Sequence, residues 1–351
     1  MMKSEFDLIL ELSKFPVNTR VISSIDLSGM SQKKIVQLLI DNQTLLPFLK
    51  NLELLKNPKF LSLKNTIKFI LEKDYLVNPE KKIPMIFSLL DELNVKFMLH
   101  KHIFYEREQG DVDILVPEDY FEFLVDKLKQ RGFSITSSES FKLGMTKYDA
   151  NEKFTIHVHA KIKWESEFIS TDDVWKRSRK ISLFNQMITV PSPEDSVLIE
   201  CAHASFEARL LRLCDLLQFL ELLKHDSINW DKVVSRLIQY GYHSAGYLYF
   251  LAMNHLANKL FNINPIPKMV LDSLEQKINS FEKTFAINNA KKLILSNDEK
   301  IAPLRISLFS SALLFISFNK NLGTKKFIWS LGVIASATIR FIQVKLRLRK
   351  L

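Results

Sequence analysis

Two carboxylates stand close together in Gly110-Asp111-Val112-Asp113, at the start of a strongly apolar stretch. The alternation of apolar residues through Val116, closed by Pro117, predicts a β-strand. Side chains two positions apart share one face of a strand, so both aspartates point the same way. Paired carboxylates repel unless a cation lies between them, and such oxygen ligands suit Mg²⁺ or Mn²⁺ holding a triphosphate. The alternative is a solvated strand face.

Four histidines form two His-x-His pairs, His100 with His102 and His157 with His159. Each pair is expected on one face of a strand. If both strands lie beside the acid strand, these histidines would assemble a transition-metal site with the two aspartates. The sequence leaves open whether they do so.

Glycine spacing argues against two other kinds of nucleotide site. None of the eight glycines forms Gly-x-Gly, so the dinucleotide-binding fingerprint is absent. Gly241 and Gly246 have the spacing of a phosphate-binding loop, but Tyr247-Leu248 follows where Lys-Ser/Thr would be required. A nest of amides around phosphates needs those residues. Neither a Rossmann dehydrogenase nor a P-loop NTPase is expected.

The period of the apolar residues divides the chain into four parts. Residues 1–93 and 193–300 are predicted to be helical, 94–192 to form a mixed core, and 301–351 a basic, apolar helical hairpin. Within the core, strands are expected at 95–100, 111–117, 133–136, 141–147 and 154–162, with a helix at 118–131. The fold class is therefore α+β, with a small mixed β-sheet that carries helices on one face and with helical N-terminal and C-terminal regions.

Local signals place several further residues. Ser31 is expected to cap a helix, and Pro84 to lie in the first turn of a helix over 83–93 after a break at Pro79. His203 and Asp215 would lie about a third of a turn out of line if they shared one continuous helix. The basic run at 175–180 is either a solvated turn or a contact for an acidic acceptor or nucleic acid.

Charge is concentrated at the C-terminal end of this 351-residue chain. The chain has 49 Lys+Arg and 39 Asp+Glu, a net +10. Residues 301–351 hold nine basic residues and no acidic residue, which leaves 49 − 9 = 40 basic and 39 acidic residues in 1–300. The main body is therefore neutral, and the overall charge does not indicate a nucleic-acid-binding protein. The segment 301–351 is expected to pack on the body, to contact an anionic membrane surface, or to span a membrane.

The two cysteines, Cys201 and Cys214, are too few for a disulfide scaffold or a thiolate metal site and are expected in the core. The N-terminus lacks a basic stretch followed by a long apolar run, so no secretory signal is visible. These features predict a cytoplasmic protein, with peripheral membrane attachment as the alternative.

Several stretches between about residues 90 and 260 are informative in combination. In order, they are Gly110-Asp111-Val112-Asp113-Ile114-Leu115-Val116, Arg131-Gly132-Phe133, Ile156-His157-Val158-His159-Ala160-Lys161-Ile162, Pro193-Glu194-Asp195-Ser196-Val197-Leu198-Ile199, His203, Arg212-Leu213-Cys214-Asp215-Leu216-Leu217 and Ile228-Asn229-Trp230-Asp231. This series resembles a family of uncharacterised nucleotidyltransferases in the polymerase-β-like superfamily.

The resemblance implies that Asp111 and Asp113 bind a divalent metal, Mg²⁺ or Mn²⁺, together with the phosphates of an NTP. An acceptor hydroxyl would attack the α-phosphorus and pyrophosphate would leave. The third carboxylate of the superfamily falls at His157, which becomes a candidate base. Lys101 stands where the superfamily usually has a Gly-Ser loop, and it is a candidate contact for the triphosphate, as is Gly110.

Two functions stay open at this point. The first is metal-dependent transfer of an NMP group from an NTP to an unknown acceptor, which is a small molecule, a protein or an RNA. The second is a catalytically degenerate binding or scaffold protein that keeps the fold, associated with a membrane surface through residues 301–351.

Overall fold

The computed structural model describes residues 8–9, 12–13, 30–54, 58–74, 79–101, 111–139, 141–149, 152–164, 166–183, 185–207, 210–295 and 304–305. The predictions for Gly110 and His102 lie outside these residues. So does nearly all of the hairpin expected at 301–351, of which only Leu304–Arg305 (β11) is described, as a strand paired with Leu210–Leu211 (β10). Among the described residues, no helix has the length and apolar character needed to cross a membrane.

The α+β fold class is confirmed by a five-stranded mixed sheet in the order β1-β2-β5-β4-β3. Strand β2 pairs parallel with β5, whereas the β1–β2, β5–β4 and β4–β3 pairs are antiparallel. The five expected strands are observed in chain order, with α7 between β2 and β3. The bounds are β1 Met98–Leu99, β2 Val112–Leu115, α7 Glu118–Gln130, β3 Ser134–Glu139, β4 Lys142–Asp149 and β5 Glu152–His159.

One face of this sheet is apolar and carries two helices. Val112 and Ile114 of β2 and Ile156 of β5 share a buried cluster with residues of α6 (Pro79–Glu92) and α7. Because strand side chains alternate, Asp113 and His157 point to the opposite face. Leu115, two positions after Asp113, belongs to a different cluster, formed with the C-terminal helices. The acid-bearing face therefore lies toward the helical region.

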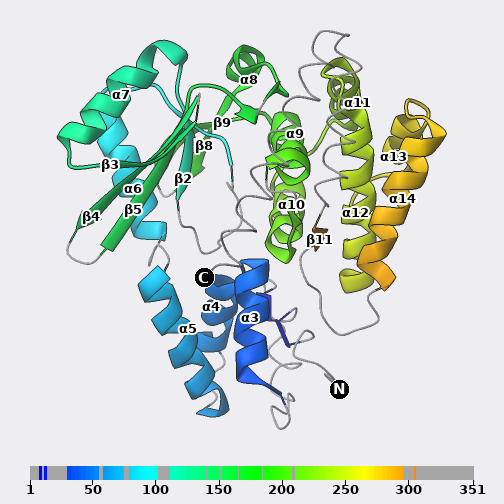
Figure 1. The fold of residues 1–351 in the computed structure, drawn as a ribbon, viewed down its shortest axis with the longest axis horizontal. Helices are drawn as coiled ribbons and strands as arrows, with labels where there is room; N and C mark the ends of the chain where they lie inside the picture. The colour runs from blue at the N-terminus through cyan, green and yellow to red at the C-terminus, as the bar shows by residue number, and fades with distance from the viewer. Residues whose placement is uncertain are drawn as a thin grey trace, which may run out of the picture.

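That helical region follows two short hairpins and the small helix α8. Figure 1 shows the sheet with α7 on the left, α9 and α10 in the middle, and α11 to α14 on the right. The bounds are β6 Lys163–Trp164, β7 Ser166–Glu167, α8 Thr171–Arg177, β8 Arg179–Leu183, β9 Gln186–Val190, α9 Pro193–Ala202, a π-helical turn His203–Glu207, α10 Leu213–His225, α11 Trp230–Gln239, α12 His243–Phe261, α13 Lys268–Glu275 and α14 Ser280–Leu295.

The N-terminal helices pack against α10. They are α3 (Gln32–Asn42), α4 (Leu45–Leu54) and α5 (Leu61–Asp74), with a 3₁₀ turn at Pro58–Phe60. Their apolar residues share a cluster with Leu213, Cys214 and Leu217. The predicted cap is confirmed, because the Ser31 hydroxyl accepts a hydrogen bond from the backbone N–H of Lys34.

One local prediction is corrected, and the condition set for a second pair of residues is not met. Helix α6 begins at Pro79, so Pro84 lies inside the helix and not in its first turn. Proline is favoured at a helix start because its missing N–H needs no partner there. His203 and Asp215 do not share one continuous helix, because the chain leaves the α-helical path at His203 and α10 begins only at Leu213. Asp215 instead caps α10, where it accepts a hydrogen bond from the Arg212 backbone N–H.

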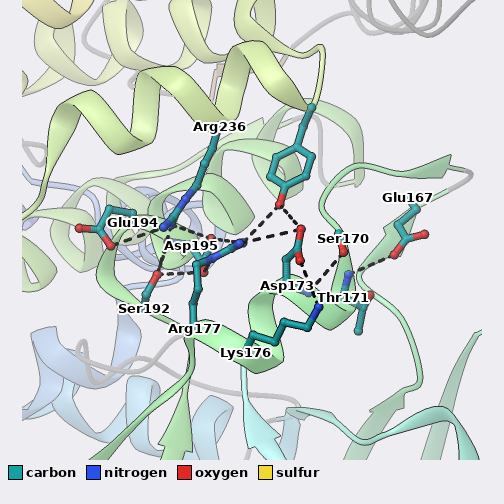
Figure 2. Close-up of polar contacts among 11 residues, drawn as sticks. Glu167, Ser170, Thr171, Asp173, Lys176, Arg177, Ser192, Glu194, Asp195 and Arg236 are labelled. Atoms are coloured by element: carbon teal, nitrogen blue, oxygen red, sulfur yellow. Dashed lines mark hydrogen bonds and ion pairs between the residues drawn. The ribbon is translucent and has the colours of Figure 1, made fainter.

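A buried ion-pair network joins the core to the helical region (Figure 2). The Asp195 side chain at the start of α9 is fully buried. It accepts two hydrogen bonds from Arg177 at 2.9 and 3.0 Å and one from Arg236 of α11 at 3.0 Å. Arg179 is likewise paired, with Asp226. The basic run at 175–180 is therefore not simply a solvated turn, because two of its arginines hold neighbouring elements together.

Candidate active site

The sheet register brings Asp113 and His157 together. In the parallel pairing of β2 with β5, Asp113 lies opposite His157, one row from the pair Val112 and Ile156. Both strands are apolar on the face that packs on α6 and α7, so burial of that face sets the register. A shift of either strand by one residue would turn its site residue, Asp113 on β2 or His157 on β5, into the apolar core.

An imidazole lies between the two carboxylates. His157 Nδ1 is 3.0 Å from Asp111 Oδ2 and 3.5 Å from Asp113 Oδ1. Burial lowers the pKa of His157, but the hydrogen bonds and charges of the two aspartates outweigh it and raise that pKa to about 9. The ring is therefore protonated at neutral pH while no other cation is present, and it offsets the repulsion between the acids.

Asp113 is also held from its buried side. His159 Nε2 lies 2.8 Å from Asp113 Oδ1, and Lys101 Nζ lies 3.8 Å from the same oxygen. Burial would raise the pKa of Asp113, but Lys101, His157 and His159 hold it well below the usual value. Burial lowers the pKa of His159 to about 4 despite Asp113. Neutral His159 must then carry its proton on Nε2 and donate it to the carboxylate.

Sequence reasoning missed the role of Gly144. It lies opposite His157 in the β4–β5 pair. A Cβ atom there would be 2.3 Å from Ser137 Oγ and 3.1 Å from His157 Cδ2. A glycine here leaves room for the His157 ring and for the Ser137 hydroxyl of β3. A glycine inside an otherwise regular strand was the available signal.

A row of hydroxyls continues from this site along the same face. Thr146 Oγ1 lies 3.0 Å from Thr155 Oγ1 and 3.2 Å from Thr136 Oγ1. The three threonines come from β3, β4 and β5. Thr155 lies two residues before His157 on β5, and the two side chains therefore share one face of the strand. This row ties the strands together beside the histidine, and sequence reasoning had not singled it out.

Two groups of side chains could each hold a metal ion. The ligand atoms of Asp111, Asp113 and His157 all lie within 4.8 Å of one another, and so do those of His100, Asp113 and His159. The rings of His100 and His159 meet edge to face with centroids 4.6 Å apart. The three predicted histidines that the structure describes are therefore all near Asp113. Two carboxylates and an imidazole form a donor set that fits a divalent cation.

The opposite pKa shifts of the two histidines predict that the free energy of unfolding is highest near pH 6.5 in metal-free protein. Above that pH, stability from His157 is lost as the pH rises toward about 9, because the folded protein holds this proton more tightly than the unfolded chain does. Below that pH, His159 becomes protonated in the unfolded chain, whereas in the folded protein it stays neutral until about pH 4. The free energy of unfolding therefore falls again as the pH is lowered. Each effect amounts to roughly 3 kcal/mol over its whole range.

Urea unfolding followed by tryptophan fluorescence from pH 5 to pH 9 measures both effects. His157→Asn is expected to flatten the alkaline side relative to wild type, and His159→Asn the acid side. His225→Asn, at an exposed histidine, should leave the profile unchanged. A His157→Asn protein with the wild-type alkaline slope would contradict the assigned pKa.

Lys101, the predicted triphosphate contact, has a side chain only 2% exposed and points at Asp113. Cys201 and Cys214 are buried thiols in the core, as predicted, and burial raises the pKa of Cys201.

Fold and site together define an α+β protein whose mixed sheet presents two aspartates and a histidine on one face. Residues 102–261 match the model of a family described as uncharacterised nucleotidyltransferase, which confirms the resemblance seen in the sequence. Among solved structures, the chain is similar to a lincosamide antibiotic adenylyltransferase with lincomycin bound. The two are 14% identical with a TM-score of 0.34, over 43% of this chain and 99% of that one. No curated protein matches the chain.

Proposed function

We propose that the protein transfers a nucleotidyl group from an NTP to an acceptor hydroxyl in a reaction that depends on a divalent cation. One observation carries this proposal, the convergence of Asp111, Asp113 and His157 on one sheet face with ligand atoms within 4.8 Å of one another. The family match over residues 102–261 supports the class of reaction. The nucleotide and the acceptor, a small molecule, a protein or an RNA, stay open.

In this proposal Asp111 and Asp113 hold the cation, either Mg²⁺ or Mn²⁺. A bound divalent ion would offset negative charge on the triphosphate and on the departing pyrophosphate. The acceptor oxygen forms a bond to the α-phosphorus while the bond from that phosphorus to the β-phosphate bridging oxygen breaks. The acceptor proton leaves to solvent, and the role of His157 as the base stays a prediction.

The other residues of the site keep Asp113 in place. His159 donates to one oxygen of the carboxylate, and the Lys101 ammonium provides a positive charge beside the same oxygen. Such contacts orient a ligating carboxylate and hold it ionised. The predicted contacts of Lys101 and Gly110 with phosphate stay predictions.

The test is incubation of the full chain with each α-labelled NTP and with Mg²⁺ or Mn²⁺, followed by measurement of pyrophosphate and of label on protein, RNA and small molecules. We expect pyrophosphate release that requires the added ion and is coupled to labelling of one acceptor class. No release and no label with any NTP, ion and acceptor class would overturn the proposal.

A second candidate is a binding protein that keeps this fold without the reaction. The observation that favours it is the contact of His157 Nδ1 with both carboxylates, which raises the pKa of His157 to about 9 and offsets their charge with no metal. It predicts nucleotide or partner binding that added divalent ions do not change. Attachment to a membrane surface through residues 301–351 and a cytoplasmic location stay predictions.

A further inference from the structure

We infer that His157 is a direct ligand of the divalent ion through Nδ1, and that the site therefore prefers a first-row transition ion to Mg²⁺. This inference rests on the cation of the proposed function and names its third ligand and its chemical class. It also changes the role expected for His157, from a base that accepts a proton to a group that holds the ion.

The first support is the orientation of the His157 ring. Its Nδ1 points at both carboxylates, at 3.0 Å from Asp111 and 3.5 Å from Asp113. Its opposite edge lies against Gly144, where an added Cβ would be 3.1 Å from Cδ2 and 3.2 Å from Nε2. Cδ2 and Nε2 of the ring thus lie against the β4 backbone at Gly144, so Nδ1 is the ring nitrogen that faces the carboxylates.

The second support is the difference between the two sides of Asp113. On its buried side the carboxylate already meets His159 and the ammonium of Lys101, whose side chains are 1% and 2% exposed. On its more accessible side lie His157 and Asp111, at 20% and 32% exposure. An ion that reaches Asp113 from solvent on that side therefore has Asp111 and His157 as its neighbouring protein ligands.

The donor set then decides the class of ion. Mg²⁺ is bound mainly by oxygen and keeps several water ligands, whereas an imidazole nitrogen suits later divalent ions of the first transition row. One nitrogen among three protein ligands is expected to favour an ion such as Co²⁺ over Mg²⁺. A carboxylate in place of His157 would reduce that preference.

The experiment uses Mn²⁺ as the probe, bound to the full chain without nucleotide. Pulsed electron paramagnetic resonance detects coupling of bound Mn²⁺ to a ligating nitrogen. The free-Mn²⁺ signal reports displacement by Mg²⁺ or by Co²⁺, and the ratio of the two displacing concentrations measures selectivity. We expect nitrogen coupling in wild type and its loss in His157→Asp, with the Mg²⁺ to Co²⁺ ratio falling on the order of tenfold.

Matched variants make the result specific. His225→Asp, the same change at an exposed histidine at the end of α10, should keep both the coupling and the ratio. If His157→Asp does not fold, His157→Asn must lose the nitrogen coupling in its place. Nitrogen coupling that persists in the folded His157 variants, or that is absent in wild type, would overturn the inference.

Metal binding and transfer separate the two proposals. Mn²⁺ binding with nitrogen coupling in a chain that transfers no nucleotide would uphold the ligand and overturn only the proposed reaction. Transfer activity in a chain whose bound Mn²⁺ shows no nitrogen coupling would uphold the proposed reaction and overturn only the inference about His157. If the chain binds neither Mg²⁺ nor Mn²⁺, both proposals fail.

Discussion

Asp113→Asn is expected to lower nucleotidyl transfer on the order of 10³-fold, which equals about 4 kcal/mol of transition-state stabilisation. The amide keeps the shape of the side chain and can still accept the His159 hydrogen bond, but it lacks the negative charge that would hold a divalent ion. Asp113 lies at the centre of the site, within reach of Lys101, His157 and His159. The measurement is the initial rate of ion-dependent pyrophosphate release.

Stability must be measured alongside, because the same substitution removes the carboxylate charge that faces the buried ammonium of Lys101. Breaking such a pair costs about 3 kcal/mol. The double variant Lys101→Met/Asp113→Asn removes both charges, so it should recover most of this loss while transfer stays low. Asp126→Asn on α7, at a side chain 66% exposed, is the matched control and should change neither quantity. Transfer at the wild-type rate by folded Asp113→Asn protein would exclude this residue from the site.

Asp195→Asn is expected to have the largest effect on stability, lowering the free energy of unfolding by about 4 kcal/mol. The carboxylate is fully buried between the guanidinium groups of Arg177 and Arg236 and also accepts a hydrogen bond from the Ser192 hydroxyl. An amide would leave two guanidinium groups, whose side chains are 28% and 14% exposed, facing a group without charge. Figure 2 shows Arg177 and Arg236 reaching Asp195 from different elements, so the loss would loosen α8, α9 and α11 together.

Glu194→Gln is the matched control for this network. Its carboxylate lies 4.0 Å from the Arg236 guanidinium, and the amide can still accept the hydrogen bond from the Asn229 backbone N–H. The cost should stay below about 1 kcal/mol. Urea unfolding of both variants measures the difference. Equal losses for the two substitutions would mean that the buried carboxylate contributes no more than its partly exposed neighbour.

The local pattern was sufficient to predict the elements that carry the site. Alternation identified β2, and the helix expected at 118–131 is observed as α7, Glu118–Gln130. These features depend on side chains within a few positions of one another, so neighbouring residues alone determine them. Strand ends were less exact, because β1 contains only Met98–Leu99 of the six residues expected at 95–100.

Long-range contacts could not be predicted from those patterns. Lys101 was named as a candidate contact for phosphate, which stays a prediction, and the basic run at 175–180 as a solvated turn or a contact for an acidic acceptor or nucleic acid. In the structure Lys101 turns to Asp113, and Arg177 turns to Asp195. The local sequence around a charged side chain does not show whether it faces solvent or a buried partner. The partner is distant in the chain and is brought close only by the packing of other elements.

The sequence by itself determined the residue types of the site. It also determined that Asp111 and Asp113 share one face, since side chains two positions apart on a strand point the same way. Only the tertiary structure decided what surrounds them. The parallel pairing of β2 with β5 aligned Asp113 with His157, and the close approach at Gly144 seated the ring. Strand order and register follow from burial of a whole sheet face against helices, which depends on residues far apart in the chain.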